Sequence, residues 1–226
     1  MSIAAQIPPP PLRDGERLSR EEFLRRWEAM PNLLRAELID GIVHMPSPIS
    51  TTHGTFQSLI DICLGVYAAS TPGCETCIAA TWLMCSDSVP QPDLTLRILP
   101  EYGGQSRLEG IYAAGAPELA VEISLTTSAR DYGAKFRLYE RNGVQEYLIV
   151  QPRSRRLVWH VLEQGKYQES ALGADGIFRS RVFPGLWLNP EQLWNRDYAG
   201  IVATAQLGTS TPEHAAFVQQ LAARQR

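Results

Sequence analysis

The sequence predicts a single α/β domain in which helices cover both faces of a central mixed β-sheet. The segment QEYLIVQP is a near-continuous apolar run, typical of a strand inside a sheet that is covered on both faces. The segment over residues 51–70 instead carries apolar residues at helical spacing, among them Phe56, Leu59, Ile60 and Cys63. Strand-like and helix-like segments alternate along the chain, which indicates one α/β domain.

Length and composition agree with one globular domain that has short tails. The chain has 226 residues, of which 44% are hydrophobic and 20% charged, so it can fill a core without a metal or disulfide staple. The formal net charge of −3 excludes a strongly basic nucleic-acid-binding module. It leaves open an enzyme that contacts nucleic acid through a local cationic rim around an acidic site.

The sequence carries no membrane or export signal. No stretch approaches the roughly 18 consecutive apolar residues of a membrane helix, and residues 1–19 lack the regions of a secretory signal. We therefore expect a cytoplasmic protein without a membrane partner. Four consecutive prolines predict a flexible lead-in over residues 1–17. The folded domain is expected over 18–197, followed by a loosely attached tail over 198–226 with one helix near 212–225.

Four cysteines are present, and two of them, Cys74 and Cys77, form a CxxC pair of the kind found in zinc and redox sites. No second pair and no paired histidines lie nearby in the sequence, and the surrounding residues alternate like a strand. Reduced, partly buried thiols are the better interpretation.

The N-terminal part contains signals for a helix and a hairpin. Ser19 and Glu22 form a capping box, which predicts a helix that ends near Trp27. Asp40-Gly41 lies between two apolar runs and predicts a tight two-residue turn between strands.

The middle of the chain is expected to contain two strands and a loop. Pro72-Gly73 ends the helix over 51–70. Strand-like runs follow at 75–84 and 93–99, and the Gly-rich residues 100–116 are expected to form a mobile loop near a site.

The remaining elements follow the strand that contains Glu122. Ser128 and Asp131 form a second capping-box pattern, and the helix that it opens is expected to end at Asn142, before Gly143. A further hairpin is predicted to turn at Gln164-Gly165.

Three carboxylates occur where strand burial is expected: Glu37, Asp93 and Glu122. Acidic groups that converge from neighbouring strands suit Mg²⁺ or Mn²⁺, which prefer oxygen ligands. Burial is expected to raise the pKa values of these acids when no metal is bound, with a nearby lysine opposing the rise. The alternative is that they are ordinary edge or surface acids, and that Lys135 forms an exposed helical pair with Asp131.

The order of the motifs ELIDGIVHMPSP, PDLTL and PELAVEISLTTSARDYGAKFRLYERNGVQEYLIVQP resembles the Uma-two family of restriction-endonuclease-like proteins. The resemblance covers roughly residues 18–197. It implies the PD-(D/E)XK nuclease fold, a mixed sheet flanked by helices. The sequence departs from the family pattern at Gln151-Pro152, where Asp-Pro is usual, and at SLTTS, where Ser-Pro-Ser is usual. Neither departure removes a proposed ligand.

The resemblance assigns roles to individual residues. Pro92-Asp93 matches the PD element and Glu122 matches the acidic (D/E) position. Ser124 occupies the usual lysine position, and Lys135 matches a lysine that the family carries on the next helix. By analogy Mg²⁺, or Mn²⁺, is held by Asp93, Glu122 and the backbone carbonyl of Ile123.

Two further residues complete the predicted site. Glu37 matches an early glutamate of the same cluster. His53, near the start of the second helix, is a candidate substrate contact, although a histidine at a helix start is often without a role. Tyr139 and Tyr147 are interpreted as core residues.

The resulting hypothesis is a metal-dependent endonuclease that hydrolyses phosphodiester bonds in DNA and forms a homodimer. The main alternative is a catalytically silent nucleic-acid-binding or regulatory module on the nuclease fold, which the acidic net charge favours. A structural protein without a nucleic-acid partner is the third interpretation. The sequence does not identify a target sequence or a partner protein.

Overall fold

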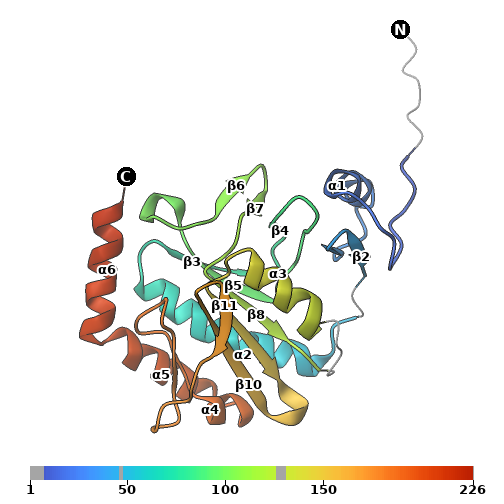
Figure 1. Cartoon of the computed structure of the whole chain (residues 1–226). Helices are drawn as coiled ribbons and strands as arrows, with labels where there is room; N and C mark the ends of the chain where they lie inside the picture. The colour runs from blue at the N-terminus through green and yellow to red at the C-terminus, as the bar shows by residue number, and fades with distance from the viewer. Residues whose placement is uncertain (1–7, 46–47, 126–130, 226) are drawn as a thin grey trace.

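A six-stranded mixed β-sheet forms the centre of the protein (Figure 1). The computed structural model describes residues 8–45, 48–125 and 131–225. The strand order is β11-β10-β9-β8-β5-β3; β8 and β9 are parallel, and the other neighbours are antiparallel. The strands are β3 (Cys74–Ile78), β5 (Leu94–Ile98), β8 (Leu119–Ile123), β9 (Glu146–Gln151), β10 (Arg156–Glu163) and β11 (Lys166–Glu169). Together with the flanking helices, this sheet confirms the predicted fold class.

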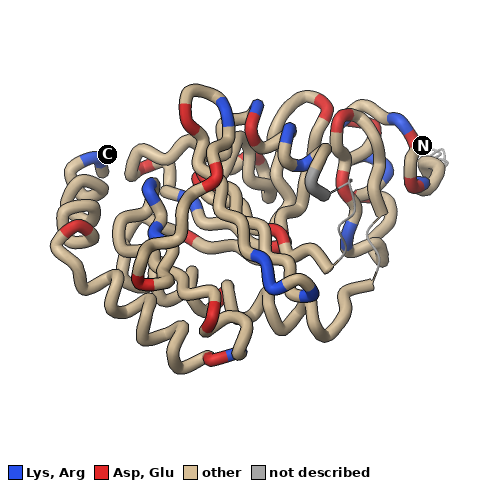
Figure 2. The backbone as a smooth tube through the Cα atoms, turned by 60° about the horizontal axis from the view of Figure 1, so that its bottom comes forward, with Lys and Arg blue, Asp and Glu red and all other residues tan. Residues whose placement is uncertain are grey.

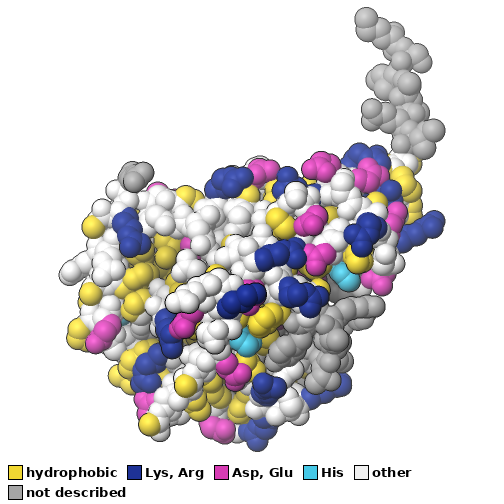
Figure 3. Space-filling view, in the orientation of Figure 1, with side chains coloured by type: hydrophobic (Ala, Val, Ile, Leu, Met, Phe, Trp, Pro, Cys, Tyr) yellow, Lys and Arg dark blue, Asp and Glu magenta, His cyan; other side chains and the backbone are white. Residues whose placement is uncertain are grey.

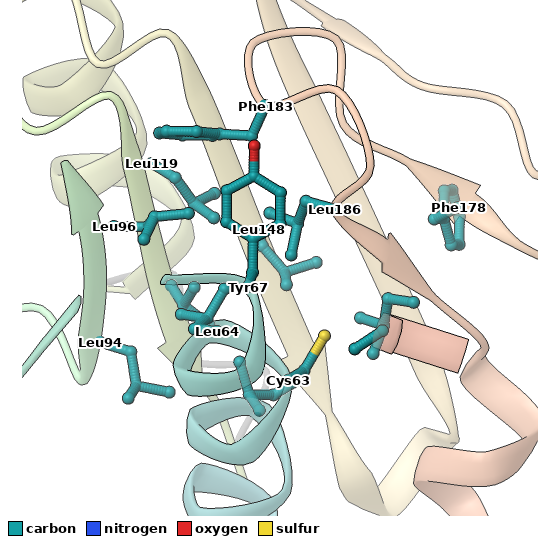
Figure 4. Packing of buried hydrophobic residues seen from close by; sticks show 14 of the residues in the cluster. Cys63, Leu64, Tyr67, Leu94, Leu96, Leu119, Leu148, Phe178, Phe183 and Leu186 are labelled. Atoms are coloured by element: carbon teal, nitrogen blue, oxygen red, sulfur yellow. The ribbon is translucent and has the colours of Figure 1, made fainter. Parts of the chain in front are cut away.

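One face of the sheet packs against helices that are far apart in the sequence (Figure 1). They are α2 (Thr51–Ser70), α4 (Pro190–Trp194), α5 (Tyr198–Thr209) and α6 (Pro212–Arg224). Figure 4 shows Tyr67 of α2 among Leu96, Leu119 and Leu148 of three strands, with Phe183 close by. Burial of these large apolar side chains is the main source of folding free energy.

The opposite face is covered by a short helical segment, with Ile39 and Met84 packed in the same cluster (Figure 1). The helical segment consists of a π-helical turn, η2 (Asp131–Lys135), and α3 (Phe136–Arg141). The predicted capping box at Ser128 lies outside the described residues. Gly143 has a positive φ of 79° just after α3, as expected for a residue that ends a helix.

Two predictions for the middle of the chain are wrong. The expected strand over 75–84 is interrupted at Ala79, where φ is 49°, so that β3 and β4 (Trp82–Leu83) belong to different sheets. The segment over 100–116, predicted as a loop, contains a 3-10 turn, η1 (Pro100–Tyr102), and two strands. These strands, β6 (Arg107–Glu109) and β7 (Tyr112–Ala114), join β4 in a three-stranded sheet. Each is too short to give a recognisable sequence period.

The N-terminal elements agree with the sequence signals. Helix α1 (Arg20–Glu28) begins after Ser19, whose hydroxyl accepts a hydrogen bond from the Glu22 amide. Strands β1 (Glu37–Ile39) and β2 (Ile42–His44) form the predicted hairpin. Asp40 and Gly41 both have positive φ, 53° and 73°, as a tight hairpin turn requires.

Both ends of the chain pack more closely than the sequence predicted. In the lead-in, Leu12 is buried and the Gly15 amide donates a hydrogen bond to the Val43 carbonyl. The tail contains the predicted helix, α6, and a second helix, α5, that was not predicted. Buried side chains such as Ile201 and Leu221 join the main core. The prediction failed because these apolar residues are widely spaced, and their burial depends on α2 rather than on local pattern.

The remaining elements are small. They are η3 (Pro152–Ser154) and the two-stranded sheet of β12 (Phe178–Arg179) and β13 (Trp187–Leu188). The predicted turn at Gln164-Gly165 joins β10 and β11, with both residues at positive φ. All four cysteines are free thiols. Among the described helices, none has the length and apolar character needed to cross a membrane.

Candidate active site

Asp93 and Glu122 lie on neighbouring strands at one end of the central sheet. Leu94 of β5 pairs with Val121 of β8 in antiparallel register, which places the preceding residue, Asp93, opposite Glu122. The backbone amide of Ile123 donates a hydrogen bond of 2.8 Å to Asp93 Oδ2. The antiparallel register therefore brings the two acids together, as expected.

The apolar strand β8 tolerates Glu122 because successive side chains point to opposite faces of the sheet. Leu119, Val121 and Ile123 contribute to the core beneath α2. Ala120 contributes to the cluster beneath α3, and Glu122 shares that face. The carboxylate is buried there, where polar partners are required to offset its lost hydration.

Lys135 supplies one of those partners. Its Nζ atom donates to Glu122 Oε1 at 2.8 Å and forms an ion pair with Glu37 Oε1 at 2.9 Å. The Lys135 side chain is 10% exposed. The parallel pairing of β8 and β9 requires a crossover connection, and this connection carries Lys135 back over β8. The alternative of a solvent-exposed Lys135 is therefore wrong.

Glu37 reaches the same cluster from the N-terminal hairpin. It lies at the start of β1, and its Oε1 atom also accepts a 2.7 Å hydrogen bond from the Gln91 amide. Because Gln91 precedes Asp93 by two residues, this hydrogen bond connects the hairpin to the segment that carries Asp93.

Tyr139 is a site residue that sequence reasoning missed. Its hydroxyl donates a 2.8 Å hydrogen bond to Glu122 Oε1, the same oxygen that Lys135 contacts, and its side chain is fully buried. The interpretation of Tyr139 as a core residue is correct as far as its ring is concerned, which packs against Tyr147. Lys135 and Tyr139 are four residues apart, and residues four apart on a helix share one face. This spacing was a usable signal in the sequence.

His53 and Arg35 contact the other acid. His53 Nε2 lies 3.1 Å from Asp93 Oδ1, in an ion-pair contact without hydrogen-bond geometry. Arg35 NH2 lies 3.3 Å from the same oxygen. His53 was a predicted candidate, and it sits in the first turn of α2, where Ser50 caps its amide. Arg35 was not predicted, because nothing in its local sequence distinguishes it from a surface arginine.

The electrostatic environment shifts the pKa values of Glu122 and Asp93 in opposite directions. Burial raises the pKa of Glu122 to about 8; Lys135 opposes this rise, while Asp93 and Glu37 add to it. Burial alone would also raise the pKa of Asp93, but His53, the Ile123 amide and Lys135 together outweigh it, and that pKa lies below its usual value. The expectation of a raised pKa is therefore wrong for Asp93. Burial alone would lower the pKa of Lys135, but Glu122 and Glu37 raise it.

The donor atoms at this site have the chemistry of a magnesium ligand set. Across the described ranges, no three His, Cys, Asp or Glu side chains are arranged to hold a metal ion together. An ion would instead rely on two carboxylates, Asp93 and Glu122, with the Ile123 carbonyl and water. Mg²⁺ is commonly bound through one or two carboxylates, with water and substrate phosphates as further ligands. The residues present therefore fit Mg²⁺ or Mn²⁺.

Comparison with known proteins agrees with this geometry. Residues 20–191 match the model of the Uma2 family, which is described as "Putative restriction endonuclease". The chain belongs to the Uma2 family. A search of curated proteins found no match.

A solved structure supports the fold of this Uma2 protein. It is the crystal structure of "a putative nuclease belonging to DUF820" from Anabaena variabilis. The match has a TM-score of 0.63 and 18% sequence identity, and it covers 79% of this chain and 98% of that chain. At this identity the likeness shows a shared fold. Membership in Uma2 places the chain in a restriction-endonuclease-like family, and the cluster around Glu122 is its candidate active site.

Proposed function

We propose that this Uma2 protein is a Mg²⁺- or Mn²⁺-dependent endonuclease that hydrolyses phosphodiester bonds in DNA. One observation carries the proposal: a buried lysine, Lys135, joins Glu122 of β8 to Glu37 of β1, beside Asp93. Perturbed ionisable groups that gather in one place are typical of catalytic sites. The Uma2 family match supports the same class of reaction.

Each residue of the site has a role in this proposal. Asp93, Glu122 and the Ile123 carbonyl would hold the metal ion, which would supply Lewis acidity and activate a water. The Lys135 ammonium, kept protonated by its carboxylate neighbours, orients the attacking water and offsets charge that develops on the phosphate. Glu37 holds Lys135 in place.

A second candidate function is a silent nucleic-acid-binding or regulatory module. The observation that favours it is that all three carboxylates already contact protein cations. The surface also lacks a dominant basic face in the views shown. Basic and acidic residues are interspersed along the backbone in Figure 2 and over the face in Figure 3.

Plasmid cleavage separates these two functions. The protein is incubated with supercoiled plasmid in Mg²⁺, in Mn²⁺ or in chelator, and the products are resolved on agarose. We expect nicked and linear DNA with metal only, and none with the Asp93→Asn variant. Arg25→Ala is the control, because Arg25 pairs with Glu22 on α1, away from the cluster. Equal plasmid integrity in every reaction, with DNA binding intact, would establish the silent module.

Two further expectations belong to this proposal by analogy with the fold. The active form is a homodimer, since cutting both strands of a duplex requires two sites or two encounters. Light scattering of the purified protein measures this directly. The proposed location is the cytoplasm, where cell fractionation should recover the protein.

A further inference from the structure

Arg35 is a half-buried arginine with an unusual set of contacts. Within the described part of the chain, its guanidinium has one hydrogen bond, from NH2 to Asp93 Oδ1 at 3.3 Å. Its Nε atom is buried and has no partner there. A structural arginine pair normally uses the planar fork of the guanidinium, with two short parallel hydrogen bonds. Arg25 shows that arrangement, with bonds of 2.7 and 2.8 Å to the two oxygens of Glu22.

His53, from helix α2, contacts the same oxygen of Asp93. Its Nε2 atom is buried 3.1 Å from Asp93 Oδ1 without forming a hydrogen bond. Two donors from different elements therefore approach one oxygen, and neither is well satisfied. The other Asp93 oxygen has a well-formed bond of 2.8 Å from the Ile123 amide.

Buried donors without an acceptor are costly and rare, so such donors in a site call for an explanation. The Arg35 side chain is 23% exposed, so a ligand can reach it from solvent. A phosphodiester offers two non-bridging oxygens at the spacing that a guanidinium fork recognises.

We propose that Arg35, with His53 beside it, binds a backbone phosphate of the nucleic acid next to the Asp93 carboxylate. The substrate class rests on the proposed function, but binding through Arg35 does not require cleavage. Arg35 is thus a substrate-binding residue, and its contact is independent of base sequence, because phosphates carry no sequence information.

Salt dependence of DNA binding tests this assignment. A fluorescein-labelled duplex is titrated with the protein in chelator, and anisotropy gives the affinity at several salt concentrations between about 50 and 200 mM. For Arg35→Ala we expect an affinity loss of about tenfold at the lowest salt, the usual order for one charged hydrogen bond. The slope of log affinity against log salt should fall by about 1, the value for one lost phosphate contact.

Matched variants separate a phosphate contact from a structural role. Arg35→Lys keeps the charge and should retain most of the slope, although it loses the fork. Arg35→Gln keeps the length without the charge and should behave like Arg35→Ala, and it replaces that variant if the alanine protein does not fold. Arg25→Ala removes an arginine that is already paired and should leave both affinity and slope unchanged.

The outcomes are distinct from those of the plasmid assay. Folded Arg35→Ala or Arg35→Gln protein with wild-type affinity and slope overturns the inference, as does wild-type protein that binds no DNA. The salt slope of Arg35→Ala could be reduced while the wild-type protein leaves plasmid uncut. That result would contradict the proposed nuclease activity and would support Arg35 as a phosphate contact of the silent module.

Discussion

The two ends of strand β8 bury carboxylates in different ways. At one end Glu122 is bonded to two side chains, Lys135 and Tyr139. Just before the other end, Glu118 is equally buried, but it accepts hydrogen bonds of 2.8 and 2.9 Å from two backbone amides. Burial raises the pKa of both acids.

Glu146, at the start of β9, resembles Glu118 rather than Glu122. It accepts a hydrogen bond from the Ser180 hydroxyl at 2.6 Å and two more from the amides of Arg181 and Val182. Backbone amides anchor a loop and are not free to move. A lysine ammonium and a phenol are side chains that can exchange partners when a ligand arrives. The kind of partner, rather than burial itself, therefore distinguishes the candidate active site from structural acids.

The largest expected difference between the two ends is in activity. Glu122→Gln should lower DNA cleavage by at least about 100-fold, since even residues behind a metal ligand cost about 10–100-fold. Glu118→Gln should retain cleavage while lowering the free energy of unfolding by roughly 1–3 kcal/mol, because one amide donor loses its acceptor. Plasmid nicking rates and urea unfolding measure the two effects. If Glu118→Gln folds and is as inactive as Glu122→Gln, the distinction between a structural acid and an active-site acid is contradicted.

The next effect concerns the buried cation. Lys135→Met should destabilise the fold by about 3–5 kcal/mol, because it removes the cation between two buried carboxylates, Glu122 and Glu37. Lys166→Met is the matched control: its pair with Glu140 has the same 2.8 Å length, but its side chain is 74% exposed. An exposed pair contributes less than about 1 kcal/mol. Urea unfolding of both variants measures the contrast, and equal losses would contradict the proposed burial effect.

A pH dependence follows from Glu122. Its pKa is raised from 4.5 to about 8, so the folded state binds a proton more tightly than the unfolded state. The resulting stabilisation is present at low pH and is lost as the pH rises through about 8. In chelator, Glu122→Gln should therefore gain stability relative to wild type between about pH 5 and 9, by on the order of 2–4 kcal/mol. If the free energy of unfolding of Glu122→Gln, minus that of wild type, falls as the pH rises, this expectation is contradicted.

The smallest effect is expected at Tyr139. Tyr139→Phe keeps the packing and removes one hydrogen bond to Glu122, which should cost about 1 kcal/mol of stability. Mn²⁺ affinity, measured by calorimetry, should also fall by roughly tenfold, the lower range for a residue behind a ligand. Tyr167→Phe is the control, because its hydroxyl donates to the Val144 carbonyl in the same aromatic cluster. We expect it to lose stability without losing metal affinity.

The sequence predicted the acids that the structure gathers around Lys135 because each interrupts an apolar strand. The sequence did not predict that Glu118 and Glu146 are buried. Their partners include backbone amides of distant segments, and any residue type other than proline can supply such an amide. Tyr139 and Arg35 escaped for a related reason. Tyrosine in an apolar cluster and arginine before a strand are both common without a role, so their assignment depended on three-dimensional contacts.

The fold was predicted where the local signal is strong and missed where burial depends on distant partners. The hairpin turns at Asp40-Gly41 and Gln164-Gly165 follow from backbone preference alone. The strands β6 and β7 have three residues each, too few to show a period. Helix α6 was predicted near 212–225, but α5 was missed because the burial of its apolar residues depends on packing against α2.

The packing of α2 against C-terminal segments has a consequence for folding during synthesis, because the ribosome makes α2 long before those segments. Helix α2 emerges early, yet its Tyr67 and the residue that follows the helix, Thr71, bond to segments made much later: Tyr67 to the Pro184 carbonyl and Thr71 to His214. Its apolar face also packs in the cluster that contains Leu221. A ribosome adds about 5–20 residues per second, so α2 waits many seconds for these partners. During that interval the nascent chain exposes an apolar helix, and we expect chaperones that recognise such surfaces to bind it there.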